Sequence, residues 1–289
     1  MPGREWSLPP LRESARVASD ELRATREMAA TPRGDARAGV AVATTTLGGV
    51  ECVTCTPESP GATVLYFHGG GYRMGAPAAW VAFTSAVAEA GGARVVAADY
   101  RLAPEHPFPA AVHDAVAAYE ALLDDAPDGP IVVGGDSAGG GLAVALAVAC
   151  RAAGVEAPNG VFALSPWVDL TIVAGTFTAN AETDQFFPLA AANEAADVYL
   201  QGHDPRHPLA SPVFADLAGF APTLLLVGGA ETLLDDTLTL SAGLAHAGAS
   251  VETHVAAGMQ HVWPMLFPEL PESAAAVAAI GRFVRGTTT

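Results

Sequence analysis

The stretch that most constrains the fold is a glycine-rich turn with a serine at its centre, Gly134–Gly141. An apolar run typical of a buried strand precedes this turn, and a long apolar helix is predicted to follow it. Because glycine has no Cβ, Gly135 and Gly139 allow the chain to turn sharply from strand to helix. We therefore expect Ser137 to stand at the turn. There, the first amides of the helix would stabilise negative charge on a reacting carbonyl oxygen.

The Gly-x-Ser-x-Gly spacing is not specific by itself, because a chain with 30 glycines can produce it by chance. A glycine-rich turn without chemistry is the alternative. The strand before it and the helix after it are the context that a nucleophile elbow requires. A phosphate-binding loop is excluded, because no lysine follows the glycines and the Gly-x-Gly-x-x-Gly spacing is absent. We interpret Ser137 as a nucleophile.

Composition excludes several other classes of function. The chain has 289 residues, of which 51% are hydrophobic, so it can form one large core, and we expect a single domain over residues 1–289. A net charge of -17 argues against nucleic acid as a partner, because such binding needs a basic surface. All 14 basic residues are arginine. Schiff-base chemistry, a pyridoxal attachment and a Ser-Lys mechanism all need a lysine and are excluded.

The sequence also predicts where the protein resides. No apolar run reaches the ~18 residues of a membrane span, and the first residues lack the build of a signal peptide. Three cysteines give no disulfide framework, which favours a reducing cytoplasm. Cys52 and Cys55 form a C-x-x-C without a second ligand pair, so we interpret them as small buried residues. No metal or organic cofactor is expected.

Strand-like and helical stretches alternate along most of the chain, which is typical of a mostly parallel sheet with helices on both faces. A hairpin at Gly48-Gly49 is expected to join the first two strands. The predicted strands are 40–47, 49–56, 62–67, 94–98, 131–133, 161–164, 223–227 and 251–255. The predicted helices of this alternation are 79–90, 109–124, 138–153, 232–247 and 272–285.

Two segments lie outside this alternation. Residues from Pro10 to about Ala30 carry apolar side chains at helical spacing, which predicts an opening helix. Between Trp167 and about Ala218 no strand is evident, and a structureless loop of that length would be unusual. We expect a helical insertion there, over the carboxyl ends of the strands, where open α/β sheets bind their ligands.

A second glycine-rich loop, from His68 to Tyr72, directly follows a predicted strand. Its three consecutive glycines expose backbone N–H groups that a ligand can approach closely. Together with the amide of Ala138, they would form an oxyanion hole of three donors. We expect His68 to hold this loop by hydrogen bonding rather than to act as a base.

A nucleophilic serine needs a base, and the base needs an acid to orient it. His261 directly follows the last predicted strand, whereas the other downstream histidines lie in the insertion, in a helix or within a strand: His203, His207, His246 and His254. Three carboxylates follow the penultimate strand, namely Glu231, Asp235 and Asp236. Glu231 comes first and is our predicted acid. The order serine, acid, histidine is that of α/β hydrolases.

Four motifs resemble the bacterial hormone-sensitive-lipase-like family of α/β hydrolases: Gly-Asp-Ser-Ala-Gly-Gly, His-Gly-Gly-Gly-Tyr, Asp-Tyr-Arg-Leu-Ala-Pro-Glu at 99–105 and Leu-Ser-Pro-Trp at 164–167. The resemblance implies an α/β-hydrolase fold with a mostly parallel, eight-stranded sheet. It also implies a helical cap from about 1–40 and 167–218, and oxyanion amides at Gly70 and Gly71. Two departures are Glu231, where the family usually has Asp, and Trp263, two residues after His261, where the family usually has Phe.

The resemblance implies a serine carboxylesterase that works through an acyl-enzyme, and the aromatic residues of the predicted pocket favour short- to medium-chain esters. Lactone or N-acetyl hydrolysis stays open because it uses the same machinery, and a non-catalytic small-molecule receptor is a further alternative. The partner would be a small-molecule ester, with neither nucleic acid nor membrane, and a homodimer stays open. We predict a substrate pocket from the following aromatic residues: Tyr72, Trp167, Phe186, Phe187 and Trp263.

Overall fold

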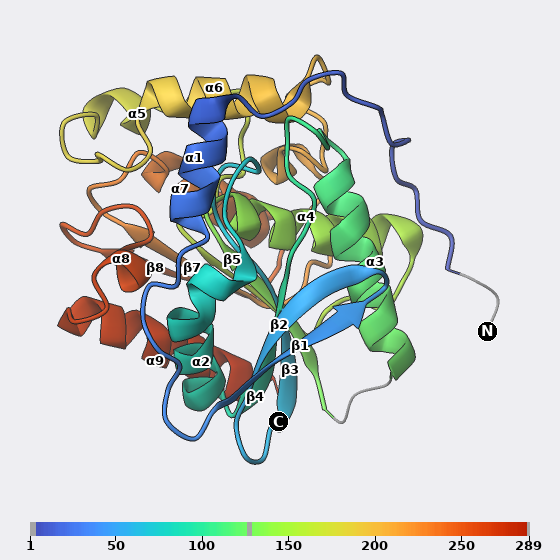
Figure 1. Ribbon diagram of the computed structural model, residues 1–289, viewed down its shortest axis with the longest axis vertical. Helices are drawn as coiled ribbons and strands as arrows, with labels where there is room; N and C mark the ends of the chain where they lie inside the picture. Colours follow the sequence, from blue (N-terminus) through green and yellow to red (C-terminus); the bar gives the residue numbers. More distant parts are fainter. Residues whose placement is uncertain (1–3, 126–128, 288–289) are drawn as a thin grey trace.

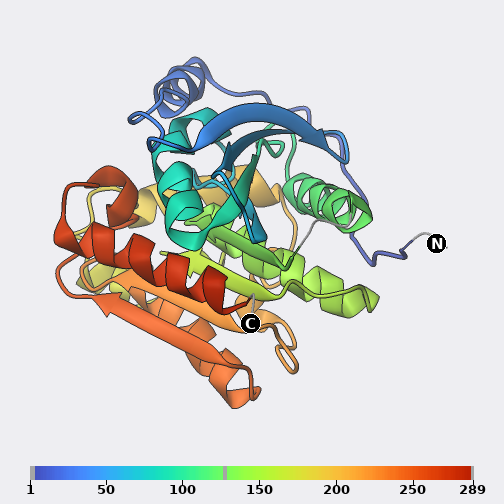
Figure 2. The same cartoon turned by 90° about the horizontal axis from the view of Figure 1, so that it is seen from below.

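The computed structural model describes residues 4–125 and 129–287. One sheet of eight strands runs through the molecule, with helices on both of its faces (Figures 1 and 2). The first three residues of the expected cap segment 1–40 lie outside the described residues. No helix within the described ranges is long and apolar enough to cross a membrane.

The strand order in the sheet is β1-β2-β4-β3-β5-β6-β7-β8. β1 and β2 form the expected hairpin and pair antiparallel, as do β2 and β4, whereas every pair from β4–β3 to β7–β8 is parallel. The strands are β1 (Ala41–Leu47), β2 (Val50–Thr56), β3 (Ala62–Phe67), β4 (Ala93–Ala98), β5 (Ile131–Asp136), β6 (Gly160–Leu164), β7 (Thr223–Gly228) and β8 (Val251–Ala256). All eight predicted strands are present.

Central strands β3, β5, β6 and β7 are buried along their whole length, as parallel strands covered on both faces must be. Helices α2 (Val81–Gly91) and α9 (Pro271–Gly286) pack side by side on one face. The other face is covered by α3 (Ala110–Asp125), α4 (Ala138–Ala153) and α7 (Leu234–His246). Two apolar cores result, one on each face of the sheet.

Further helical segments lie between these elements. They are the 3-10 turns η1 (Pro77–Trp80) and η2 (Pro212–Phe214), together with α5 (Thr176–Ala179), α6 (Leu189–Leu200) and α8 (Trp263–Leu266). The predicted insertion between residues 167 and 218 is therefore helical in part, through α5 and α6. These two helices run along the end of the molecule where α1 (Asp20–Ala29) also lies (Figure 1).

The predicted opening helix is wrong over its first half. Helix α1 spans only Asp20–Ala29, and Ser19 begins it by accepting a hydrogen bond from the Leu22 amide at 3.2 Å. Residues before Ser19 are irregular because their polar groups bond to distant elements instead. Ser14 donates to Gln201 at 2.9 Å and Arg16 binds Asp197 at 2.8 Å. The segment is thus tied to the C-terminal end of α6.

Candidate active site

Ser137 lies at the sharp turn between β5 and α4, as predicted. Its backbone angles, φ 54° and ψ -122°, are rare for a residue with a Cβ and cost on the order of 1–3 kcal/mol. Neighbouring segments hold it there: its amide donates to Leu164 O at 2.9 Å, and its carbonyl accepts from Trp167 N at 2.9 Å. A strained residue pinned from both sides is the arrangement of a nucleophile elbow.

Gly135 and Gly139 are required for this turn, as the sequence predicted. A Cβ on Gly139 would collide with the backbone carbonyls of Phe67 and His68, and a Cβ on Gly135 would collide with the Gly139 carbonyl. The start of α4 therefore packs directly against the end of β3. This close approach brings the amide of Ala138 next to the loop that follows β3.

His261 and Ser137 are hydrogen-bonded although 124 residues separate them. The distance between His261 Nε2 and Ser137 Oγ is 2.9 Å, and both residues are at most 5% exposed. His261 lies on the loop between β8 and α8, where the residue after it, Val262, takes a left-handed φ of 46°. An imidazole at this distance can take the hydroxyl proton of Ser137.

Glu231 faces the other nitrogen of the same imidazole. Its Oε1 lies 3.5 Å from His261 Nδ1, and no other group among the described residues bonds to either atom. The separation is slightly longer than a hydrogen bond, as such contacts often are without a substrate. Glu231 is fully buried on the loop after β7. The three predicted residues are thus brought together in the order Ser137, His261, Glu231.

A fourth residue, Ser165, joins the acid to the histidine loop. It donates through Oγ to Glu231 Oε2 at 2.8 Å and accepts from the Val262 amide at 3.1 Å. The Gly228 amide binds the same Oε2 at 2.9 Å. The sequence shows Ser165 only as part of the Leu-Ser-Pro-Trp motif, without indicating this role. Its position directly after β6, between the strands that carry Ser137 and Glu231, is the signal that could have found it.

The pKa of His261 is raised above its usual value of 6.5. Burial acts to lower it, but the nearby carboxylates of Glu231, Asp184 and Asp136 outweigh burial because they stabilise the imidazolium. The site is therefore built to hold a proton on His261 once it has been transferred.

Asp235 and Asp236, the alternative acids, are engaged elsewhere. Asp235 accepts from the Thr176 amide at 3.0 Å. Asp236 is buried and accepts from the amides of Val168 and Asp169 at 3.3 and 3.1 Å. Burial raises the pKa of the Asp236 carboxyl to about 8. Neither side chain contacts His261, whereas Glu231 does, so the geometry favours Glu231.

The loop after β3 has the open amides that the sequence suggested. Within residues 4–125 and 129–287, no group accepts a hydrogen bond from the amides of Gly70, Gly71 or Ala138. Gly70 has φ 120° and a Cβ there would strike the Met74 carbonyl, so only glycine fits. Three unpaired N–H groups beside a nucleophile can hold a developing oxyanion.

Asp136, which precedes Ser137, anchors this loop and was not identified from the sequence. Its Oδ1 accepts from the Gly69 amide at 3.0 Å, Tyr66 Oη at 2.6 Å and Trp80 Nε1 at 2.8 Å. Burial raises the pKa of Asp136 to about 6 despite these three donors. The anchor thus fixes the loop relative to the elbow.

His68 lies in the loop as a support, in line with its predicted role. Its Nδ1 is 2.7 Å from Gly69 O, its ring stacks on Tyr100 at 4.5 Å, and its carbonyl accepts from Tyr100 Oη. Burial lowers the pKa of His68 to about 4, which keeps the ring neutral. It has no contact with Ser137 that would make it a base.

Three of the five predicted pocket residues gather beside the site. The ring centroids of Tyr72 and Trp167 are 6.2 Å apart, and those of Trp167 and Phe187 are 5.1 Å apart. The Phe187 ring in turn stacks on the His261 ring, with their centroids 5.5 Å apart. The other two predicted pocket residues, Phe186 and Trp263, lie away from this group. Phe186 is 45% exposed and its ring lies against Phe267, whereas Trp263 belongs to the core on the opposite face of the sheet.

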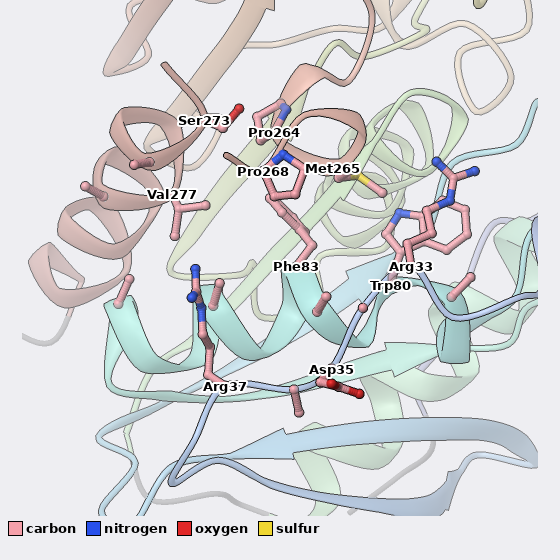
Figure 3. A pocket seen from close by; sticks show the side chains of 18 of the residues that line it. Arg33, Asp35, Arg37, Trp80, Phe83, Pro264, Met265, Pro268, Ser273 and Val277 are labelled. Atoms are coloured by element: carbon pink, nitrogen blue, oxygen red, sulfur yellow. The ribbon is translucent and has the colours of Figure 1, made fainter. Parts of the chain in front are cut away.

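A groove of about 560 Å³ lies between the loop 33–38, α2 and the residues that follow Trp263 (Figure 3). It contains none of the residues of the predicted triad. Trp80 forms part of its wall beside Arg33, whose guanidinium carbon is 5.7 Å from the indole ring. The groove is separate from the serine site, and its wall residue Trp80 contacts the site's supporting residues through a hydrogen bond to Asp136 and a ring contact with His68.

The cysteines are buried and unpaired, as Cys52 and Cys55 were predicted to be. Burial raises the pKa of Cys52 to about 11, so its thiol is unreactive near neutral pH. Across the described ranges, no three His, Cys, Asp or Glu side chains are grouped so that they could hold a metal ion.

Similarity to known proteins agrees with this geometry. A family model for the alpha/beta hydrolase fold matches residues 64–265. The chain is 43% identical over 241 residues to an acetyl-hydrolase of Streptomyces hygroscopicus, with 81% of each chain covered. It is 32% identical over 222 residues to an esterase of Acinetobacter venetianus, with 76% of this chain and 73% of that protein covered.

Solved structures resemble it over nearly the whole length. An esterase from the bacterial hormone-sensitive lipase family is 39% identical and has a TM-score of 0.85, with 95% of this chain and 100% of that chain covered. The structure of EstE5 soaked with p-nitrophenyl butyrate is 38% identical and has a TM-score of 0.87, with 98% and 95% covered. The chain therefore belongs to the bacterial hormone-sensitive-lipase-like family of α/β hydrolases.

Proposed function

We propose that the protein is a serine carboxylesterase that hydrolyses short- to medium-chain esters through an acyl-enzyme on Ser137. The observation that carries this is the 2.9 Å contact between Ser137 Oγ and His261 Nε2, beside three unpaired backbone amides. A hydroxyl, a base and an oxyanion hole in one place are the requirements for acyl transfer. Membership of a family whose relatives include named esterases supports the same reaction.

In the first half of the reaction, Ser137 Oγ forms a bond to the ester carbonyl carbon while His261 Nε2 takes the hydroxyl proton. The amides of Gly70, Gly71 and Ala138 hold the oxyanion. The C–O bond to the alcohol then breaks, and His261 returns its proton to the leaving alcohol. Glu231 stabilises the imidazolium in between and fixes its orientation.

In the second half, a water molecule attacks the acyl carbon while His261 takes its proton. The bond to Ser137 Oγ breaks and the serine recovers the proton, which releases the carboxylic acid. Both halves use the same oxyanion amides and the same base. No metal or organic cofactor enters the proposed steps.

The N-terminal segment and residues 167–218 would form the cap over this site. Support comes from the bonds that tie Ser14 and Arg16 to α6, and from Arg26, which binds Glu105 at 2.8 Å and the Ala103 carbonyl at 2.7 Å.

We infer a cytoplasmic location because the cysteines are buried and unpaired, and thiols stay reduced in the cytoplasm.

Removal of an acetyl group from nitrogen is the second candidate, because relatives from Streptomyces hygroscopicus and Mycobacterium tuberculosis are named acetyl-hydrolase and putative acetyl-hydrolase. The same machinery cleaves an acetyl ester, an N-acetyl amide or a lactone. A panel of acetyl esters, N-acetylated amines and lactones at matched concentrations would rank the three. Faster release of acetate from the amines than from the esters would favour the second candidate.

The decisive experiment is Ser137→Ala with Ser59→Ala as its control. Ser59 is exposed on the loop before β3, at the opposite end of the sheet. We expect Ser137→Ala to abolish hydrolysis of p-nitrophenyl esters and labelling by a fluorophosphonate, with an unchanged circular dichroism spectrum. Ser59→Ala should match the wild type in both assays. More than a tenth of wild-type activity in folded Ser137→Ala would refute the proposal.

A further inference from the structure

A segment of the insertion, residues 176–187, wraps around the loop that carries Glu231. Three side chains of this segment donate to three consecutive carbonyls of that loop. Thr183 Oγ1 binds Ala230 O at 2.8 Å, Asn180 Nδ2 binds Glu231 O at 2.7 Å and Thr176 Oγ1 binds Thr232 O at 2.6 Å. The backbone of the acid loop is therefore shaped by residues of the insertion rather than by the sheet alone.

Asp184 is the buried centre of this contact, with an exposure of 1%. Its Oδ2 accepts from the Thr232 amide at 2.8 Å and lies 3.0 Å from Thr232 Oγ1. Its Oδ1 accepts from the amides of Phe186 and Phe187 at 3.0 and 3.1 Å. Three backbone amides surround this buried carboxyl together with the Thr232 hydroxyl, whose single proton is shared between Asp184 and the Phe187 carbonyl. This set of donors suits an ionised carboxylate.

The two ends of this connection meet the catalytic imidazole at different places, one at its Nδ1 edge and one on its face. Thr232 directly follows Glu231, whose carboxylate faces His261 Nδ1. Phe187 stacks its ring on the His261 ring with 21° between the planes. The Thr232 hydroxyl is also 2.9 Å from the Phe187 carbonyl, so it closes the link between the two.

We propose that Asp184 is a positioning residue of the triad, which holds Glu231 and Phe187 against His261 and adds negative charge that stabilises the imidazolium. This inference rests on the proposed function and deepens it. The insertion then supports the triad directly, besides lying over the site, because the contacts of Asp184 determine the positions of Glu231 and the Phe187 ring.

The charges that face His261 come from three elements. Glu231 belongs to the loop after β7, Asp136 to the end of β5 and Asp184 to the insertion, and each raises the pKa of His261. Replacing Asp184 by asparagine removes one of these charges and leaves Glu231 and Asp136 in place. The pKa of His261 should fall, because the imidazolium loses part of its stabilisation.

The test compares Asp184→Asn with Glu182→Gln, which removes a carboxylate from the same segment. Glu182 is exposed and makes no hydrogen bond that would shape the loop. The rate of p-nitrophenyl butyrate hydrolysis is measured from pH 5 to pH 9. We expect Asp184→Asn to lower kcat about ten- to a hundredfold at pH 8, with little change in KM. Its acid limb should move by roughly half a pH unit or more toward lower pH.

Glu182→Gln should keep the wild-type kcat and the wild-type acid limb. A fall in kcat for Asp184→Asn without any move of the acid limb would overturn the proposal, because a merely structural role leaves the pKa of His261 unchanged. Unaltered kinetics would overturn it as well. A wild type without esterase activity or Ser137 labelling would instead refute the proposed function itself, and this inference with it.

Thr232 supplies a second pair of variants, which decides the question if Asp184→Asn does not fold. Thr232→Val removes the hydroxyl that contacts Asp184 and Phe187, whereas Thr232→Ser keeps it. We expect Thr232→Val to lower kcat about tenfold and Thr232→Ser to restore it to near the wild-type value. Equal rates in the two variants would overturn the inference, because the hydroxyl would then hold nothing that catalysis needs.

Discussion

Ser165 Oγ donates a hydrogen bond to Glu231 Oε2 at 2.8 Å, and this leaves the other oxygen of the same carboxylate facing His261. The Gly228 amide binds Oε2 as well. Glu231 is therefore held in one orientation by two donors before it meets the imidazole. A glutamate has one more rotatable bond than an aspartate, and these two donors restrict the extra freedom.

Ser165→Ala should lower kcat about ten- to a hundredfold with little change in KM, because Glu231 loses a donor and the Val262 amide loses its acceptor. Steady-state hydrolysis of a p-nitrophenyl ester measures this. Ser211→Ala is the matched control, because Ser211 is also buried and lies away from the triad. Its hydroxyl accepts a hydrogen bond from the Leu170 amide. Equal losses of kcat in the two variants would show that Ser165 has no specific role.

The identity of the acid gives the second prediction. Glu231→Gln should lower kcat by about 10³ to 10⁴, because an amide cannot stabilise the imidazolium. Asp235→Asn and Asp236→Asn should each lower kcat at most about tenfold. Their side chains accept hydrogen bonds from the amides of Thr176, Val168 and Asp169 instead of contacting His261. The comparison needs purified variants with native circular dichroism spectra. The reverse ranking would assign the acid to the first turn of α7.

Much of this site was predictable because local sequence determines it. The elbow around Ser137 needs small residues at fixed spacing, and the strand that places Glu231 is a continuous apolar run. The strand before His261 has fewer apolar residues but is bounded by turn residues on both sides. Once those strands are ordered in a parallel sheet, their following loops meet at one edge. The resemblance of the motifs to a known family added the choice of Gly70 and Gly71 within the loop after β3.

The remainder depends on contacts between distant segments that no local pattern encodes. Asp184 was not identified because Thr232, its partner on the acid loop, lies 48 residues away. The opening segment has helical spacing, yet residues before Ser19 bond to α6 and to Glu105 instead of forming a turn of helix. Trp263 follows His261 closely in sequence, but the start of α8 directs it to the opposite face of the sheet.

The pH dependence of kcat/KM gives the third prediction. His261 must be neutral to accept the proton of Ser137, and its pKa in the folded protein lies above 6.5. Activity should therefore rise with pH, and its half-maximal point on the acid side should lie above pH 6.5. A pH series at constant ionic strength measures it. An acid limb with its midpoint well below pH 6.5 would mean that burial outweighs the three carboxylates around His261.

The fourth prediction concerns stability. The pKa of Asp236 is raised by burial from 3.8 to about 8, so the folded state binds its proton more tightly than the unfolded state does. The stability that this proton gives is complete below about pH 4 and is lost as the pH rises toward 8. Asp236→Asn keeps an acceptor for the two amides and does not ionise. The difference in Tm between Asp236→Asn and the wild type should therefore grow in favour of the variant from pH 5 to pH 9. A difference that does not depend on pH would contradict the raised pKa of Asp236.

The last prediction is the acyl-chain length that the site accepts. The rings of Tyr72, Trp167 and Phe187 are all buried and close off the space beside Ser137 and His261. Such a wall leaves room for a short acyl chain, and a long one would have to displace rings that cost several kcal/mol to move from a packed core. We expect kcat/KM to be highest for acetyl to octanoyl esters and lowest for palmitoyl esters. A maximum at palmitoyl would refute this.

Variants of two adjacent phenylalanines test whether the buried aromatic rings limit the length of the acyl chain. Phe187→Leu removes a buried ring that contacts Trp167 and His261, whereas Phe186→Leu changes a ring that is 45% exposed. The readout is the ratio of kcat/KM for octanoyl over acetyl esters, because a ratio cancels any loss of triad geometry that affects both substrates equally. We expect Phe187→Leu to raise this ratio about three- to tenfold, as the space freed by the ring admits additional methylene groups. Phe186→Leu should leave the ratio unchanged. If Phe186→Leu raised the ratio and Phe187→Leu did not, the acyl chain would run along the surface toward Phe267 rather than toward Trp167.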